Sequence, residues 1–183
     1  MKKIAIPVIV AAMGFAASAA HAAGPANNGG IVTINGELTS NTCDVSGNGQ
    51  GNNFTVTLPT LSASELSAAG SVAGSTGFNI ALTNCTPNSG NVHTFWEYGA
   101  NTLSDGNLLN NGTATKVEVQ LVDYNGGMKV IDVSKADGAQ NSQAVAIASG
   151  KANLQYAAQY ISPLGSATAG SVTTNVTYSM VYQ

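Results

Sequence analysis

The chain has 183 residues, with six basic and nine acidic side chains and a formal net charge of −3. Only 8% of the residues are charged, and glycine, alanine, serine, threonine and asparagine are abundant. A chain with net negative charge and no arginine lacks the basic surface that nucleic-acid binding needs, so this class of partner is excluded. Valine, isoleucine and leucine are well represented, which excludes a disordered protein.

The first 22 residues are predicted to be a secretory signal peptide. Lys2 and Lys3 precede an apolar run, which ends in the A-x-A cleavage site formed by Ala20, His21 and Ala22. A membrane anchor is the alternative, but the run is short and small residues occupy the cleavage positions. Removing 22 of the 183 residues leaves 161, which suits one domain, with four lysines against nine carboxylates and a charge of −5. We therefore expect a soluble exported protein.

The exported part contains two cysteines, Cys43 and Cys85. An even number of cysteines in an oxidising compartment predicts a disulfide. The bond would close a loop of about forty residues, for which the chain-entropy estimate is about 4 kcal/mol. A metal site is not expected, because His93 is the single histidine after the signal peptide and too few further ligands remain. We predict that His93 lies at the surface or at a sheet edge.

Stretches with strand character recur along the chain and are separated by turns rich in glycine, asparagine and serine. They cover residues 31–38, 54–58, 78–82, 92–98, 116–123, 128–133, 152–160 and 172–182. Most of them alternate between apolar and polar residues, which predicts half-buried strands. Asn125-Gly126 predicts a hairpin, and Ser62 three residues before Glu65 predicts one helical turn. The expected fold is an all-β antiparallel sandwich with one disulfide.

The last fourteen residues carry the clearest pattern of the chain. Alternate positions are mostly apolar, and the positions between them are mostly polar, which predicts a half-buried strand. The positions of the first set, together with the terminal residue, are Gly170, Val172, Thr174, Val176, Tyr178, Met180, Tyr182 and Gln183. A chain that ends in a fully patterned strand needs something to cover that strand.

This ending resembles the C-terminal motif of bacterial fimbrial subunits that are assembled by the chaperone–usher pathway. In that family a glycine lies fourteen residues from the end and a tyrosine is penultimate, as Gly170 and Tyr182 are here. The Leu-Pro pair at 58–59 and the stretch 78–85 leading to the second cysteine occur in the same order as in the family. Residues 78–85 and 153–160 resemble major shaft subunits of type 1-like fimbriae.

The resemblance implies an immunoglobulin-like antiparallel β-sandwich that lacks its last strand. A donor strand from another subunit would complete it. The chain would then comprise a signal peptide (1–22), an N-terminal donor-strand extension (23–36) and a pilin domain (37–183). The donor-strand positions would be Ala26, Asn28, Gly30, Val32 and Ile34. Asn28 departs from the family, where this position contacts the pocket in which strand exchange begins.

The alternating C-terminal positions would line the acceptor groove. A periplasmic chaperone would pair with them before assembly and would hold the terminal carboxylate of Gln183. The implied function is that of a structural subunit of an adhesive surface fimbria, exported through the periplasm, with no catalysis and no cofactor. Its implied partners are neighbouring pilin subunits, the periplasmic chaperone, an outer-membrane usher and a tip adhesin.

Two other functions remain open at this point. The chain could be a minor, adaptor or tip pilin rather than a shaft subunit. It could also be a secreted carbohydrate-binding β-sandwich, because the side chains of Phe95, Trp96 and Tyr98 could form an aromatic patch that stacks on sugars.

Overall fold

The computed structural model describes residues 32–34 and 42–183. The predicted signal peptide and the predicted donor-strand residues Ala26, Asn28 and Gly30 lie outside this range. The chain divides into two units, with the boundary between Leu38 and Thr39. Within the described residues, no helix has the length and apolar character needed to cross a membrane. The folded domain is therefore described by residues 42–183.

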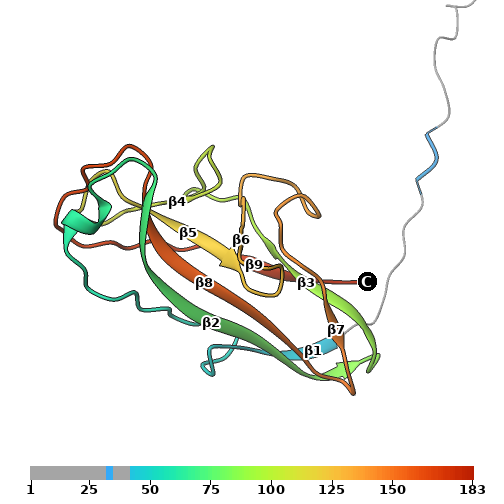
Figure 1. Ribbon diagram of the computed structural model, residues 1–183. Coiled ribbons are helices and arrows are strands. Elements are labelled where there is room, and N and C mark those ends of the chain that lie inside the picture. Colours follow the sequence, from blue (N-terminus) through green and yellow to red (C-terminus); the bar gives the residue numbers. More distant parts are fainter. Residues whose placement is uncertain (1–31, 35–41) are drawn as a thin grey trace, which may run out of the picture. The chain divides into compact units, whose positions relative to one another are not determined.

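This domain is built from strands and one short helical turn (Figure 1). In chain order the elements are β1 (Thr42–Gly47), the 3-10 helix η1 (Ala63–Leu66), β2 (Ser71–Thr86), β3 (Gly90–Trp96), β4 (Leu108–Leu109), β5 (Glu118–Asp123), β6 (Lys129–Val130), β7 (Val145–Ile147), β8 (Ala152–Ser162) and β9 (Tyr178–Tyr182). The prediction of an all-β fold is confirmed.

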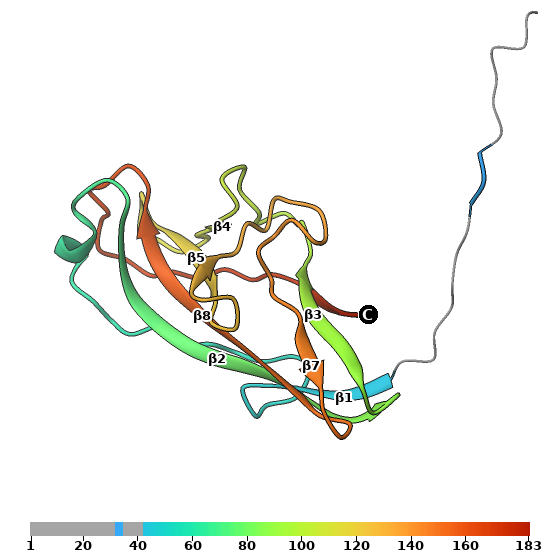
Figure 2. The same cartoon turned by 45° about the vertical axis from the view of Figure 1, so that its right-hand side comes forward.

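The strands form two antiparallel sheets. The larger sheet has the order β1-β2-β8-β5-β4, with β6 paired to β5, and the smaller sheet has the order β7-β3-β9. Figures 1 and 2 show β2 and β8 running side by side as long curved strands, while β3, β7 and β9 lie in the other layer. This arrangement is the sandwich that the alternating sequence predicts.

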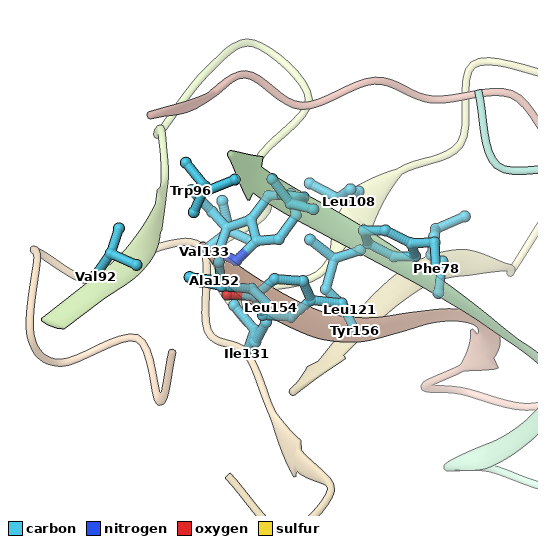
Figure 3. Packing of buried hydrophobic residues seen from close by; sticks show 14 of the residues in the cluster. Phe78, Val92, Trp96, Leu108, Leu121, Ile131, Val133, Ala152, Leu154 and Tyr156 are labelled. Carbon is cyan, nitrogen blue, oxygen red and sulfur yellow. The ribbon is translucent and has the colours of Figure 1, made fainter. Parts of the chain in front are cut away.

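The core lies between the two sheets and is formed by inward-facing side chains. Phe78 and Ile80 of β2 are paired with Tyr156 and Leu154 of β8, and all four side chains are buried. Trp96 of β3 meets Tyr156 edge-on, with 5.2 Å between the ring centroids (Figure 3). Such edge-to-face contacts between aromatic rings add to the stabilisation that comes from burial alone.

The predicted disulfide between Cys43 and Cys85 is present. It joins β1 to the end of β2, next to the pair formed by Thr42 and Thr86. The loop that it closes contains residues 44–84. The predicted helical turn is also present, because the Ser62 hydroxyl accepts a hydrogen bond from the Ser64 N–H at the start of η1.

Three features differ from the sequence-based expectations. Residues 54–58 and 172–177 were both expected to belong to strands, but neither segment belongs to a sheet. The side chain of His93 was expected to be accessible, yet the residue is only 4% exposed. Its Nε2 atom lies 2.7 Å from Asp137 Oδ1, so the loop that carries Asp137 covers the ring.

Candidate functional site

A groove of about 940 Å³ runs along the domain between two segments that flank the core. We call residues 52–58 the first lip and residues 171–180 the second lip. Both lips show alternating burial, although most of their length belongs to no sheet. The floor between them is mostly apolar and includes Phe78, Trp96, Leu108, Leu121 and Ala158.

The second lip has hydrogen-bond partners along only one of its edges. The carbonyl groups of Ser171, Thr173 and Thr177 accept hydrogen bonds from backbone N–H groups of residues 114, 111 and 97 at 3.0, 2.8 and 2.9 Å. Neighbouring residues of a strand direct their backbone groups to opposite edges. The even-numbered residues therefore direct theirs into the groove, and no backbone hydrogen bond is found for residues 172, 174 and 176 in the described part of the chain.

The first lip faces the groove in the same way. Its even-numbered side chains, Phe54, Val56 and Leu58, pack against the core. The backbone of Thr55 points away from the groove, where it forms two hydrogen bonds with the Gln50 side chain, at 3.1 and 3.2 Å. Within residues 42–183 no backbone hydrogen bond joins the two lips. The groove is therefore a gap between two unpaired backbone edges.

Glycines allow the close backbone approaches that position both lips. A side chain at Gly47, the last residue of β1, would overlap the Phe54 ring, so this glycine makes room for the first lip. A side chain at Gly170 would overlap the backbone of Ala114, and one at Gly112 would overlap the Ser171 carbonyl. The glycine fourteen residues from the end thus lets the second lip lie directly against the 112–114 loop.

The lips contact each other at Tyr178, the first residue of β9. Its hydroxyl donates a hydrogen bond of 2.7 Å to the Asn52 carbonyl on the first lip, and its ring centroid lies 5.8 Å from that of Phe54. Trp96 supports the ring from the floor, with 6.0 Å between the centroids. Burial raises the pKa of the Tyr178 hydroxyl, so the group that donates to Asn52 is neutral at physiological pH, and burial raises the pKa of Tyr182 in the same direction.

Such a groove suits the binding of an extended peptide. Exposed strand edges are prone to pair with a further strand, and an apolar floor favours alternating apolar side chains on that strand. Thr174 departs from this apolar character among the inward-facing residues of the second lip, because its hydroxyl is buried without a hydrogen-bond partner among the described residues. A group of potential metal ligands is not found in the described part of the chain.

The structure brings together the predicted C-terminal site residues. Val172, Thr174, Val176, Tyr178 and Met180 all line the groove. Gly170 adjoins its start, and Tyr182 packs against the core beyond its other end. Gln183 follows β9, where its backbone N–H and C=O pair with Asn91 at 2.8 and 3.0 Å.

Of the predicted donor-strand residues, the described ones are Val32 and Ile34. Their side chains are 83% and 88% exposed. Large apolar side chains with so little cover are candidates for burial in a partner. The role of the first lip was missed by sequence reasoning: residues 54–58 show the same alternation as any half-buried strand, and nothing in their pattern indicates that a neighbouring strand is missing.

The predicted aromatic patch for sugar binding is not formed. Trp96 is only 2% exposed and belongs to the core, whereas Tyr98 is exposed. A ring that lies in the core cannot stack on a sugar at the surface, so this prediction is wrong.

Residues 58–183 match the model of the FimA family, which is described as type-1 fimbrial protein, A. The chain belongs to this family. The F17 fimbrial protein of Escherichia coli is 40% identical to it over 178 residues, which cover 93% of this chain and 96% of the relative. The major fimbrial subunit SMF-1 of Stenotrophomonas maltophilia (strain K279a) is 42% identical over 159 residues, which cover 84% and 92% of the two chains.

Solved structures share the fold of this FimA-family protein. The P pilus rod subunit PapA matches with a TM-score of 0.50 at 19% identity, covering 84% of this chain and 100% of that one. The CupB6 tip adhesin from Pseudomonas aeruginosa matches with a TM-score of 0.54 at 15% identity, covering 68% and 34%. The resemblance to chaperone–usher fimbrial subunits is thus confirmed. The chain is a structural subunit of a surface fimbria and polymerises with other pilin subunits.

Proposed function

We propose that this fimbrial subunit polymerises by donor-strand complementation, in which the N-terminal extension of one copy fills the groove of the next. The observation that carries the proposal is the unpaired edge of residues 172–176, which faces an apolar groove. Addition of a strand to such an edge is the mode by which chaperones and pilins pair. The donor residues are Ala26, Asn28, Gly30, Val32 and Ile34.

The physical basis of a stable contact is the simultaneous burial of apolar side chains and pairing of backbone groups. Full burial of Val32 and Ile34, which are exposed in the subunit, contributes about 1.5–3 kcal/mol for each side chain. Each backbone hydrogen bond adds about 1 kcal/mol net, and the strand can form several of them along each lip. A donor strand held in this way dissociates very slowly.

Export and assembly complete the proposal. Residues 1–22 direct the chain to the periplasm and are removed there. A periplasmic chaperone first pairs with the second lip and binds the carboxylate of Gln183, an exposed residue, through basic side chains. An outer-membrane usher then exchanges the chaperone for the donor strand of the next subunit, and a tip adhesin ends the fibre. This role requires no catalytic group and no cofactor.

The test compares Ile34→Asp with the matched control Thr33→Asp. A charge at position 34 would be buried in the groove, whereas position 33 has the opposite parity and points away from it. We expect Ile34→Asp to abolish SDS-resistant multimers of surface material while leaving chaperone binding intact, and Thr33→Asp to retain both. A chain lacking residues 24–34 should also run as a monomer without heating. Normal fibres from the Ile34→Asp variant would refute the proposal.

A further inference from the structure

One end of the domain presents a large apolar side chain to solvent. The Leu164 side chain is 82% exposed, more than any other large apolar side chain within residues 42–183. It lies in the turn between β8 and the second lip, at the end of the domain that also carries η1 (Figure 1). We call this end, formed by residues 63–70, 112–116 and 162–169, the η1 end. Val72 at the start of β2 is 50% exposed there as well.

The turn that carries Leu164 is held in place by backbone contacts. The Ser162 carbonyl accepts hydrogen bonds from the N–H groups of Gly165 and Gly70, at 3.2 and 2.8 Å. A side chain at Gly165 would overlap the backbone of residues 67–69, so the turn lies directly against the segment that follows η1. A side chain presented on such an ordered turn loses little conformational freedom on binding, which favours contact with a partner.

The opposite end of the domain contains the disulfide. It is formed by the start of β1, the turn between β2 and β3 and the turn between β7 and β8 (Figures 1 and 2), and we call it the disulfide end. A shallow recess of about 20 Å³ lies there and is lined in part by Cys43, Pro87, Ile147 and Tyr182. The apolar atoms of these four residues make the recess suitable for the tip of an aliphatic side chain.

The short chain between the donor strand and the domain limits where a neighbouring copy can lie. The extension precedes Thr42, so it leaves each copy at the disulfide end. Thr42 follows Ile34 by eight residues, which span at most about 29 Å in an extended chain. In a fibre joined by donor strands, the donating domain must therefore lie close to one end of the groove that its strand fills.

The two ends of the groove are not equivalent for this neighbour. The second lip begins beside Gly170 at the η1 end and leads to Gln183 at the disulfide end. A donating domain at the disulfide end would crowd the copy that receives the extension leaving from that same end. A donating domain at the η1 end meets no such conflict. The disulfide end of one copy then lies beside the η1 end of the next, and this head-to-tail arrangement can continue along a fibre.

The charges at the two ends are compatible with such a contact. The η1 end carries the exposed Glu65 and Lys116, while the disulfide end carries the exposed Lys151, Asp44 and Gln183 with its terminal carboxylate. A head-to-tail contact can pair Glu65 with Lys151, and Lys116 with either carboxylate. Exposed ion pairs of this kind contribute little affinity, but they favour the correct orientation of the partners.

We propose that neighbouring domains of the fibre touch directly, through Leu164 at the η1 end of one copy and the recess at the disulfide end of the next. The partner of the exposed leucine is thus a second copy of this chain. The contact limits bending between the two domains, which would otherwise be joined only by the chain between the donor strand and Thr42. This inference rests on the proposed donor-strand function.

The reactivity of an introduced thiol tests the contact. Leu164→Cys provides a single free thiol, because the two native cysteines are joined to each other. Met128→Cys is the matched control, since Met128 is 68% exposed and its hairpin begins opposite Tyr156, in the middle of β8. Each variant would be compared as isolated fibres and as single subunits whose groove is filled by a peptide of residues 24–40. The peptide fills the groove without bringing a neighbouring domain.

We expect the Leu164→Cys thiol to react with a maleimide about ten-fold more slowly in fibres than in peptide-filled subunits, which corresponds to about 1.4 kcal/mol for opening the contact. The Met128→Cys thiol should react equally in both. Equal reactivity of the Leu164→Cys thiol would overturn the contact while leaving the donor-strand proposal intact. Protection that disappears when the fibres are diluted would assign Leu164 to contacts between fibres and would overturn it too. Normal fibres from Ile34→Asp would overturn both proposals.

A second variant tests whether the contact stiffens the fibre. Leu164→Asp places a charge against the apolar recess. We therefore expect these fibres to retain their SDS-resistant multimers but to show a shorter persistence length in electron micrographs. Met128→Asp should change neither property. Unchanged bending of the Leu164→Asp fibres, or loss of their multimers, would contradict a contact between domains that acts beside the donor strand.

Discussion

Strand β8 and the second lip have the same kind of sequence pattern but opposite structural situations. β8 pairs with β2 along one edge and with β5 along the other, and its inward side chains Leu154 and Tyr156 are fully buried. The second lip has partners along one edge, and its inward side chains are half-buried. Alternation therefore indicates which face of a segment is apolar. It does not indicate whether the segment has a paired neighbour along both of its edges or along only one.

Loss of the disulfide is expected to reduce the stability of the subunit more than any other change. Replacing Cys43 and Cys85 by serine frees the loop that contains the whole first lip but leaves the second lip attached to β3. We expect the free energy of unfolding to fall by about 4 kcal/mol, measured by urea denaturation of the purified subunit. The affinity for a peptide of residues 24–40 should fall with it. An unchanged affinity would mean that the first lip is positioned without the disulfide.

The difference between β8 and the second lip can be tested by truncating one inward-facing side chain in each of them. Leu154→Ala creates a cavity in the closed core and should reduce the stability of the free subunit by about 3 kcal/mol. Val176→Ala should cost less than about 1 kcal/mol there, because its side chain is only half-buried before a donor strand covers it.

In the assembled fibre the order of the two destabilising effects should change, because a donor strand would then enclose the Val176 side chain. The measurement is thermal unfolding of the purified subunit beside the boiling threshold of the multimers. If Val176→Ala destabilised the subunit as much as Leu154→Ala does, the groove would already be closed in the free subunit.

The sequence predicted the elements more completely than their pairing. The alternation at 152–160, the Asn125-Gly126 hairpin and the disulfide between Cys43 and Cys85 all correspond to the structure. The C-terminal positions of the groove were also found, because their parity is regular up to Tyr182.

Other features depend on contacts between distant residues and leave no local signal. The first lip becomes one wall of a groove because no strand pairs with its inner edge. His93 is buried because the loop that carries Asp137, 44 residues further along the chain, covers its ring. Likewise, nothing in the order of residues 171–183 indicates that the Tyr178 hydroxyl would reach Asn52 on the opposite lip.

The smallest expected effect concerns Glu118 of β5, a residue that does not line the groove. Burial, together with the nearby Asp105 carboxylate, raises the pKa of the Glu118 side chain. Its ionised form is then less favourable in the folded state than in the unfolded chain, so stability is lost as pH rises above the usual range of a glutamate. Glu118→Gln removes this loss and can still accept the hydrogen bond from Asn107.

We expect Glu118→Gln to raise the Tm by less than about 3 °C at pH 7 and to leave it unchanged at pH 4, as measured by thermal scans at both values. The affinity for the donor peptide should not change at either pH. A rise of equal size at both values would contradict the assignment to ionisation.

The position of the disulfide has a mechanical consequence for a fibre built in this way. Tension would enter each subunit through the donor segment and reach Cys43 nine residues after Ile34. The disulfide passes that force directly to Cys85 at the end of β2, so the 41 residues between the two cysteines cannot be pulled out. In a reduced subunit the same residues could extend by roughly 140 Å. In such a fibre the covalent bond would limit how far each subunit could lengthen under shear before its groove released the neighbouring subunit.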